Sequence, residues 1–410
     1  MIKRISLVLM SCVLSLSSLV ACTGGGEQAA TKTEASKEGG ASGGKTVKIG
    51  IIGARTGPSA TLGQYFDGAT AAIQHINEQG GLNGYTFEVV MRDDEANPTK
   101  SKELIKDLLH KEKVSVVIGP TNTSNALAIL PEIFNAKVPL IDAVATGSKI
   151  GEEAEKLAKG GENYFFRTTT PDDAQADAIA DYVKKKGYQK PVILHDETAY
   201  GKGGLLELQK GLEKIKVKPI KEIGFPMNSP DLTPQVLEGK QNGADVLLVW
   251  ALGQDMAQIA KAKQKLGIQI EMIGSTSLQT PNFRKLAGDS ANGTLTIWPK
   301  DHVREKKEGD RTKRIKDAYE VYKKYSQNAL SIDDAGTVMF AYDAAIIAMN
   351  AIAQAGPEPE AVRDAIESIK HEKLASKDVI QYSKDNHEVW LGEDLGMVIV
   401  ENGKLFEMSE

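Results

Sequence analysis

The sequence predicts an α/β protein with two lobes of similar plan, each a parallel sheet covered by helices. Short, apolar, β-branched runs alternate with amphipathic segments, which is the pattern of parallel strands buried on both faces. The alternation restarts after a crossover near Arg167 to Thr170. About 365 residues follow a polar stretch that ends near Lys45, and one hydrophobic core rarely extends over that length.

The first series of strands and helices begins at Thr46. Its strand patterns are short and apolar, and its helix patterns repeat apolar residues every three or four positions. The predicted strands are residues 46–53, 86–94, 114–120 and 138–144. The predicted helices are a segment through Tyr65, Ala69, Ala72, Ile73 and Ile76 that ends at Gly80-Gly81, and residues 98–110 and 125–135.

The second series repeats this plan and is followed by a different C-terminal region. Its predicted strands are residues 191–196, 217–225, 245–252 and 270–275. Its predicted helices are residues 172–186, 203–214, 232–241 and 255–266. Residues 311–369 read as mostly helical, and residues 379–408 read as strands with turns at Gly396 and at Asn402-Gly403.

The N-terminal segment has the layout of a secretory signal peptide. A basic start precedes an apolar run to about Leu19, which is interrupted by serines and falls short of the roughly 20 apolar residues of a permanent membrane span. The residues Leu-Val-Ala-Cys up to Cys22 resemble the lipobox of bacterial lipoproteins, which implies cleavage before Cys22 and lipidation of its sulfur. The alternative is an ordinary signal peptide that is cleaved after Ala21 and leaves a free thiol.

The predicted organisation of this region is a signal peptide at residues 1–21 and a lipidated Cys22 with a flexible tether at residues 22–45. The tether contains no large apolar residue, and Cys12 lies in the removed segment, so Cys22 has no disulfide partner in the mature chain. The formal charge is −5, and loss of Lys3 and Arg4 makes it −7. This acidity disfavours nucleic acid as a partner, because phosphate binding requires a basic face.

Motifs for catalysis, nucleotides and metals are missing from the sequence. It contains no G-x-S-x-G nucleophile elbow and no G-x-x-x-x-G-K-[ST] phosphate loop, and "GARTGPSATLG" after the first strand lacks the dinucleotide spacing. The six histidines form no H-x-x-x-H or H-x-H pair. The sequence therefore predicts no catalytic residue, no metal and no cofactor, and it does not predict an enzyme.

Small polar residues follow several predicted strands. In "VVIGPTNTSNALAI" a helix starts after the run of small hydroxyl and amide residues from Thr121 to Asn125. Free backbone N–H groups at this start, with the hydroxyls of Thr123 or Ser124 beside them, favour an anion such as a carboxylate, unless one residue merely caps the helix. The next strand ends in a small, polar, exposed loop at residues 144–148. Tyr200 and Trp250 follow strands of the second series and suit an amphipathic ligand, although aromatic residues there can also be packing material.

From Thr46 to the end, the chain closely resembles the type I periplasmic binding proteins of ABC transporters, in the branched-chain amino acid branch. The resemblance rests on "IGIIGARTGPSATLGQYFDGATAAIQHINEQGGLNG", "DDEANPTK", "VIGPTNTSNA", "VPLIDAVATG", "FFRTTTPDDAQ", "HDETAYGKG" and "NGTLTIWP", in family order. It implies two doubly wound, Rossmann-like lobes joined by three crossover strands, which close around a ligand by hinge motion. On that pattern, lobe 1 is 46–168 plus 298–378, and lobe 2 is 169–297 plus 379–410.

The resemblance also implies roles for individual residues. The carboxylate-binding serine of the family matches Thr123, and the pair of a backbone group and a hydroxyl matches Val144 and Thr146. The aromatic residues of the second lobe match Tyr200 and fall near Trp250. The side chain that contacts the apolar part of the ligand falls at or near Leu62.

One position departs from the family pattern. Amino-acid binders hold the ammonium group of the ligand with an acidic residue after the strand that matches "EMIGSTSLQ", and Thr276 or its neighbours Ser275 and Ser277 stand there. A buried ammonium without a carboxylate partner costs several kcal/mol. An aromatic or branched aliphatic acid, or a neutral amide, is therefore an alternative to an amino acid. The acids that would replace the missing one are Asp142, Asp196 and Glu197.

The predicted function is an extracytoplasmic, solute-binding lipoprotein. It is predicted to bind a small amphipathic ligand, namely a branched-chain or other amino acid or a related carboxylate, in a cleft between the lobes and to deliver it to the permease of an ABC importer. The protein is predicted to be a monomer, anchored by lipid to the periplasmic or extracellular face of the cell-envelope membrane. The first alternative is a receptor that reports its ligand to a membrane kinase or chemoreceptor. The second is a secreted esterase or amidase, for which the sequence offers no nucleophile and base.

Overall fold

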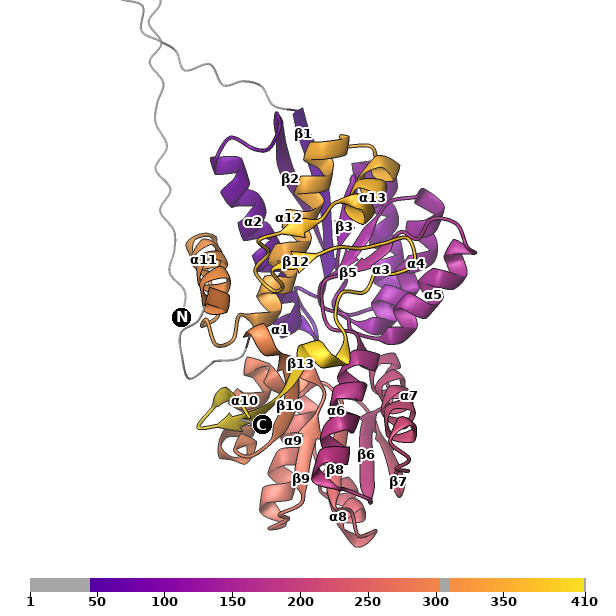
Figure 1. The fold of residues 1–410 in the computed structure, drawn as a ribbon, viewed down its shortest axis with the longest axis vertical. Coiled ribbons are helices and arrows are strands. Elements are labelled where there is room, and N and C mark those ends of the chain that lie inside the picture. Colours follow the sequence, from indigo (N-terminus) through magenta and orange to yellow (C-terminus); the bar gives the residue numbers. More distant parts are fainter. Residues whose placement is uncertain (1–44, 303–309, 409–410) are drawn as a thin grey trace, which may run out of the picture. The chain divides into compact units, whose positions relative to one another are not determined.

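The structure is a computed structural model that describes residues 45–302 and 310–408 (Figure 1). The predicted signal peptide at residues 1–21 and the predicted lipidation site Cys22 lie outside the described residues, as does the tether before Lys45. Two sheets with helices on both faces make up the described chain, as the sequence predicts.

The first sheet is parallel, with the strand order β2-β1-β3-β4-β5. Its strands are β1 (Lys45–Gly53), β2 (Tyr85–Asp93), β3 (Val116–Ile118), β4 (Leu140–Asp142) and β5 (Phe165–Arg167). Alternate residues of β3 face opposite sides, because Val116 and Ile118 belong to one core cluster and Val117 to another. Both faces are therefore apolar, and each is covered by helices.

Helices cover both faces of the first sheet. One face carries α2 (Asp67–Glu78), α12 (Gly336–Ala355) and α13 (Pro359–Ser368), and the other carries α3 (Pro98–Lys106), α4 (Thr123–Ala136) and α5 (Ser148–Ala158). The shorter or peripheral helices are α1 (Ala60–Gly63), η1 (Gln64–Phe66), the π-helical η2 (Asp107–Glu112), η5 (Lys300–His302) and α11 (Asp310–Tyr325). By length and composition α12 would span a membrane, but 72% of its apolar window is buried in the core.

The second sheet is mixed, with the order β14-β13-β10-β9-β8-β6-β7. The parallel strands are β6 (Pro191–Asp196), β7 (Lys221–Phe225), β8 (Val246–Trp250), β9 (Glu271–Gly274) and β10 (Leu295–Pro299), and the antiparallel ones are β13 (Leu395–Glu401) and β14 (Lys404–Glu407). The helices of this lobe are α6 (Asp172–Lys186), α7 (Ala199–Lys214), α8 (Thr233–Gln241), α9 (Gly253–Lys265), η3 (Thr276–Gln279), α10 (Pro281–Ala287), η4 (Gly288–Ala291) and η6 (Gly392–Asp394).

The chain crosses between the sheets after β5, after β10 and before β13. The third crossing lies along β5, because the Tyr382 hydroxyl donates to the Arg167 carbonyl (2.9 Å) and the Arg167 N–H donates to the His387 carbonyl (3.2 Å). The apolar residues that begin at position 379 form the short strand β12 (Val379–Ile380). This strand pairs with β11 (His371–Glu372) and not with the second sheet. We therefore propose that lobe 2 resumes after about residue 390 and not at residue 379.

One local expectation from the sequence is wrong, and one helix is missing from the predicted elements. Gly396 lies inside β13 opposite Trp298, where the missing side chain leaves room for Lys300, and the turn comes only at Asn402-Gly403. Helix α5 follows β4 directly and buries Ile150 and Ala154, although its sequence is otherwise polar. Both departures arise from packing partners that are distant in the sequence.

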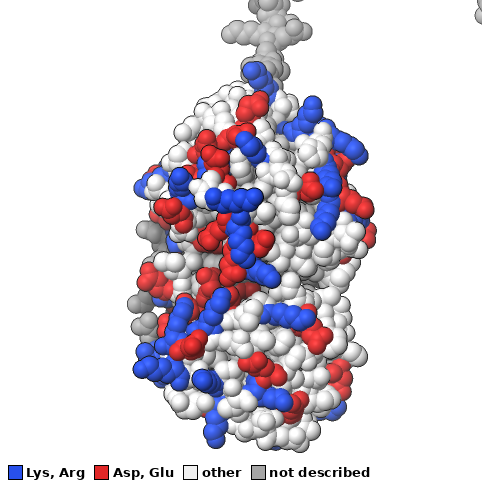
Figure 2. All heavy atoms as spheres, turned by 90° about the vertical axis from the view of Figure 1, so that its right-hand side faces the viewer, with Lys and Arg blue, Asp and Glu red and all other residues white. Residues whose placement is uncertain are grey.

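Charges of both signs mix on the face that carries α5 and α7 (Figure 2). Lys210 of α7 lies 3.6 Å from the carboxylate of Glu152 of α5, and Lys214 lies 2.6 Å from that of Asp177. On this face neither sign of charge dominates.

Two adjacent glycines of α7 test the packing of this helix on β8. A methyl group at Gly204 would overlap the indole of Trp250, whereas one at Gly203 would meet open space. We expect Gly204→Ala to lower the free energy of unfolding by about 1–3 kcal/mol through overpacking. Gly203→Ala should raise it by up to about 1 kcal/mol, because alanine favours the helix. Urea unfolding measures both, and equal effects would contradict the close contact of α7 with β8.

Candidate functional site

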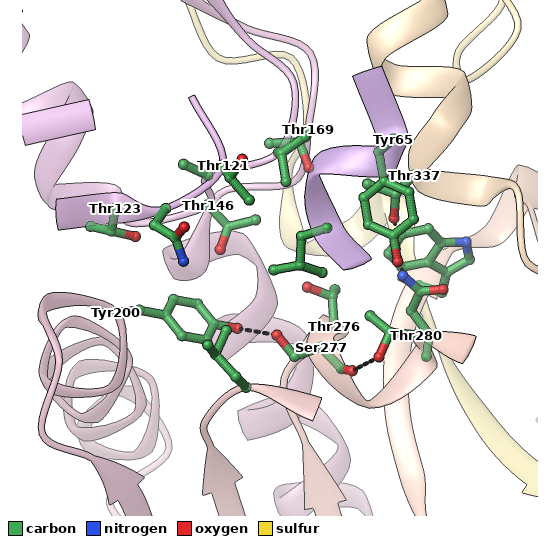
Figure 3. A pocket seen from close by; sticks show the side chains of 17 residues that line it. Tyr65, Thr121, Thr123, Thr146, Thr169, Tyr200, Thr276, Ser277, Thr280 and Thr337 are labelled. Carbon is green, nitrogen blue, oxygen red and sulfur yellow. Dashed lines mark hydrogen bonds between the residues drawn. The ribbon is translucent and has the colours of Figure 1, made fainter. Parts of the chain in front are cut away.

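A pocket lies where loops after strands of both sheets meet (Figure 3). It contains about 510 Å³ of empty space, part of it open to solvent. The first sheet contributes the residues that follow β1, β3 and β4, and the second contributes those that follow β6, β8 and β9. The carboxyl ends of parallel strands are the usual ligand positions in such sheets.

The start of α4 forms one wall of the pocket. No side chain caps this helix, and the N–H groups of Thr123 and Ser124 have no acceptor among the described residues, whereas that of Asn125 donates to the Asn122 carbonyl (3.0 Å). Oγ1 of Thr123 and Oδ1 of Asn122 are buried and have no hydrogen-bond partner among the described residues. The Thr121 hydroxyl instead accepts from the Ala54 N–H (2.9 Å), which ties this loop to the end of β1. The Thr123 hydroxyl at this helix N-terminus can donate to an anionic group of a ligand, whereas Oδ1 of Asn122 can only accept from a donor.

The loop after β4 supplies the adjacent wall, and it is buried rather than exposed as the sequence predicted. Oδ1 of Asp142 accepts from the N–H groups of Val144 (3.1 Å) and Ala145 (2.8 Å), which folds the loop inward. Val144 and Thr146 both line the pocket. The Val144 N–H donates to Asp142 and is not free to bind a ligand. The backbone group of Val144 that remains for a ligand is its carbonyl.

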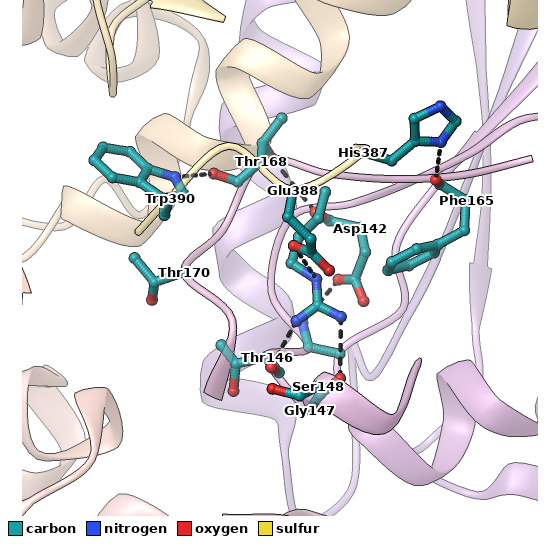
Figure 4. A network of polar contacts seen from close by, with 12 residues as sticks. Asp142, Thr146, Gly147, Ser148, Phe165, Thr168, Thr170, His387, Glu388 and Trp390 are labelled. Carbon is teal, nitrogen blue, oxygen red and sulfur yellow. Dashed lines mark hydrogen bonds and ion pairs between the residues drawn. The ribbon is translucent and has the colours of Figure 1, made fainter. Parts of the chain in front are cut away.

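The side chain of Arg167 binds the backbone of this loop at Thr146 and Gly147, which are labelled in Figure 4. Its guanidinium is fully buried and donates to the carbonyls of Thr146 (2.6 Å) and Gly147 (3.0 Å). Its Nε lies 3.2 Å from Oε2 of Glu388 in the third crossing. Burial raises the pKa of Glu388, and the positive charge of Arg167 opposes this rise. One cation therefore joins the first crossing, the third crossing and the pocket loop.

Tyr200 forms the wall from the second lobe. It lies at the start of α7, and its hydroxyl donates to Ser275 (2.8 Å) and lies 3.1 Å from that of Ser277. Trp250 does not line the pocket: it is fully buried behind Tyr200, with ring centroids 6.2 Å apart. Leu252 lines the pocket instead, because the chain reaches the cleft only two residues after Trp250.

Thr276 stands in the pocket at the position of the missing acid. Its N–H donates to Oε1 of Gln175 (3.1 Å), and the amide nitrogen of Gln175 donates to the Thr170 carbonyl (3.0 Å). Among the described lining residues none is charged. The three acids named as replacements, Asp142, Asp196 and Glu197, do not line the pocket.

Two buried carboxyl groups lie near the pocket walls without lining it. Burial raises the pKa of Asp142 to about 7, against the opposing charge of Arg167. Burial also raises the pKa of Asp172 to about 8, and its Oδ2 has no partner among the described residues. Neither group is therefore fully ionised at neutral pH, and neither offers a full negative charge to a ligand.

The structure brings most of the predicted ligand residues together. Those that line the pocket are Leu62, Thr123, Val144, Thr146, Tyr200 and Thr276. Ser124 does not, and lies in an adjoining cavity with Thr198 and Met227. The described residues contain no group of three or more His, Cys, Asp or Glu side chains that would hold a metal.

Sequence reasoning missed the polar residues at the far side of the pocket. These are Tyr65, Gln279 and Thr337, which come from η1, η3 and α12. Tyr65 follows the apolar pattern of its helix, and Thr337 lies more than two hundred residues from Thr123. Among these three residues, Tyr65 alone belongs to a sequence pattern, and the apolar periodicity of its helix indicates core packing rather than a ligand contact.

Comparison with known proteins places the chain among binding proteins. Residues 46–402 match the family model described as periplasmic binding protein. The Leu/Ile/Val-binding protein of Escherichia coli (strain K12) is 26% identical over 258 residues, which are 62% of this chain and 68% of that protein. A type 1 periplasmic binding protein from Bordetella pertussis Tohama I has a TM-score of 0.79 at 25% identity, with 89% of this chain and 100% of that chain covered. A solute-binding protein of an ABC transporter from R. palustris, solved in complex with 4-hydroxybenzoate, has a TM-score of 0.75 at 24% identity, with 89% and 96% covered.

Removal of the buried guanidinium should destabilise the protein strongly. Arg167→Met removes one of two donors from each of the Thr146 and Gly147 carbonyls, which keep the N–H groups of Asp172 and Ile150, and leaves Glu388 without its cation. We expect a loss of about 3–5 kcal/mol in the free energy of unfolding, measured with urea. Lys214→Met is the control, because the Lys214 side chain is 63% exposed and its ion pair should contribute less than about 1 kcal/mol. A loss below about 1 kcal/mol for Arg167→Met would contradict this role.

Asp142 should make the stability depend on pH. Its pKa is near 7 in the folded protein and near 3.8 without burial, so the unfolded chain releases this proton at lower pH than the folded protein. The free energy of unfolding should therefore fall as the pH rises from about 4 to about 7, and this group should have no further effect above that range. Asp142→Asn keeps the Oδ1 acceptor and should flatten the curve in a series of urea unfolding experiments. Equal slopes in both proteins would show that Asp142 is ionised throughout.

Proposed function

Because the chain belongs to the periplasmic binding protein family, we propose that it is an exported solute receptor for a small carboxylate without an ammonium group. The family membership supports binding of a small molecule between the two lobes. It does not select the ligand: the relatives include a protein named for leucine, isoleucine and valine and one solved with 4-hydroxybenzoate. The ligand class must therefore be inferred from the residues that line the pocket of this chain.

The observation that carries the proposal is the uncharged lining of the pocket. An α-amino acid brings a carboxylate and an ammonium group, and the ammonium needs a carboxylate or several carbonyl groups around it. Thr276 supplies a hydroxyl at the position where amino-acid binders place an acid, and burial keeps Asp142 and Asp172 partly protonated. A ligand ammonium would therefore lose its hydration without gaining a counter-charge.

A carboxylate has better partners in the same pocket. The N-terminus of α4 carries free N–H groups and the positive end of the helix dipole, which stabilises a nearby anion by up to about 2 kcal/mol in partly buried sites. The unpaired hydroxyl of Thr123 adds a donor that rotates to suit the ligand. Leu62, Val144 and Leu252 supply apolar contacts beside this polar end.

The remaining parts of the proposed function follow from the sequence of the chain and from its family. We infer that Cys22 carries the lipid anchor, since Leu-Val-Ala-Cys precedes a polar tether. The protein then stays at the membrane surface as a monomer and passes its ligand to the permease of an ABC importer. The proposal includes no catalytic step, and the relatives are named as binding proteins.

Matched pairs of ligands with and without an amine test this proposal. We expect 4-methylpentanoate and 3-phenylpropanoate, but not leucine and phenylalanine, to raise the melting temperature of the whole chain in mild detergent. A ligand at 100 times its dissociation constant adds about 2.7 kcal/mol to the free energy of unfolding, which a thermal shift detects. A shift with the amino acids alone would contradict the proposal, and so would an equal shift with the corresponding amides.

Thr123 lines both the pocket and the adjoining cavity, whereas Ser124 lines the adjoining cavity and not the pocket. Thr123→Val removes the unpaired hydroxyl and should weaken carboxylate binding about 10- to 100-fold in calorimetric titrations, since hydrogen bonds to charged groups contribute about 1.5–3 kcal/mol. Ser124→Ala is the control and should change the affinity by less than about threefold. A larger loss of affinity for Ser124→Ala than for Thr123→Val would instead place the ligand in the adjoining cavity.

A further inference from the structure

The pocket has a second polar end, away from the start of α4. In Figure 3, Tyr65 and Thr337 lie on the opposite side of the pocket from Thr123 and Tyr200. Gln279 joins them, because its amide nitrogen donates to the Thr337 hydroxyl (3.0 Å). Apolar side chains, including that of Leu62, line the pocket as well. A ligand that fills this pocket therefore meets polar groups at both ends.

The second end is buried and offers both a donor and an acceptor. Tyr65 is 2% exposed and Gln279 is 3% exposed. Oε1 of Gln279 accepts no hydrogen bond from the described residues, so its lone pairs are free for a ligand. The Tyr65 hydroxyl is both a donor and an acceptor, so it can bind a ligand group while it keeps its hydrogen bond with Thr337. A buried polar group without a partner costs free energy, and a ligand group that pairs with it recovers that cost.

This end of the pocket does not favour a second charge. Its lining groups are a phenol, an amide and a hydroxyl, and burial raises the pKa of the Tyr65 phenol, which therefore stays neutral. Behind Tyr65, Arg284 forms an ion pair with Asp334, so the two charges nearest to this end compensate each other. A ligand hydroxyl fits these groups, because it can donate to Gln279 Oε1 and accept from Tyr65. A carboxylate would have to face the oxygen of Gln279.

We propose that the ligand carries an uncharged hydroxyl group at the end opposite its carboxylate, and that Tyr65, Gln279 and Thr337 select for this hydroxyl. This inference rests on the proposed function, which places the carboxylate at α4. It narrows the ligand class from small carboxylates to hydroxy acids in which an apolar ring or chain separates the two polar groups. Apolar acids of the same length should bind more weakly, because they leave Gln279 unpaired.

Titration calorimetry with matched acids tests this selection. The pairs are 4-hydroxybenzoate and benzoate, 4-hydroxyphenylacetate and phenylacetate, and 6-hydroxyhexanoate and hexanoate, with 4-methylbenzoate as a control for size. In at least one pair we expect the hydroxy acid to bind at least about tenfold more tightly to the whole chain in detergent. In that pair, Tyr65→Phe combined with Gln279→Leu should reduce the ratio to less than about threefold, because the variant offers the hydroxyl no partner and no longer leaves a polar group unpaired beside the parent acid.

A second variant makes the two proposals distinguishable. Thr123→Val should weaken both members of a pair by the same factor and leave their ratio unchanged, because it acts on the carboxylate end. If acids bind but no pair shows a preference for the hydroxyl, the inference is wrong and the proposed function stands. If no acid binds, both are wrong. The affinity ratios of the wild-type protein decide these outcomes even where the double variant fails to fold. In that case the single variant Tyr65→Phe, which retains the aromatic ring, takes its place.

Discussion

The buried guanidinium of Arg167 is the interaction on which the arrangement of the site depends. It comes from the first crossing between the lobes, pairs with Glu388 of the third crossing, and donates to two carbonyls of the loop that carries Thr146. The guanidinium group is planar, stays charged and carries several N–H donors, so it can contact two carbonyls and a carboxylate at once. A lysine would satisfy fewer of these partners. The side chain of Arg167 therefore links the first and third crossings to the loop that carries the pocket residue Thr146.

The neutrality of the pocket is a consequence of where the charges lie. Acidic residues are present close to its walls, but Asp142 accepts from two backbone N–H groups and faces Arg167, and Asp172 is buried behind Thr146. Hydroxyl and amide groups cost less to bury than charges, and they can serve as donor or acceptor. A pocket built from them binds one ligand charge only where the backbone supplies the opposite partial charge, as the start of α4 does.

Much of the fold was predictable, because strands buried on both faces and amphipathic helices leave strong local patterns. The predicted bounds of α6 match the structure, and Thr123 and Tyr200 stand at helix starts as expected. Local patterns fail where a distant partner decides the outcome. Trp250 has the sequence context of a pocket residue, but Gly204 of α7 allows its indole to pack inward, behind Tyr200.

The sequence by itself determined the α/β plan, the two lobes and the first polar end of the pocket, because each depends on residues that are close together along the chain. Only the tertiary structure decided that the loop after β4 is buried and that the nearby acids do not line the pocket. It also decided that Tyr65, Gln279 and Thr337 form a second polar end. The physical reason is that hydrogen bonding and desolvation depend on which groups meet in space, and these groups come from segments that lie far apart in the sequence.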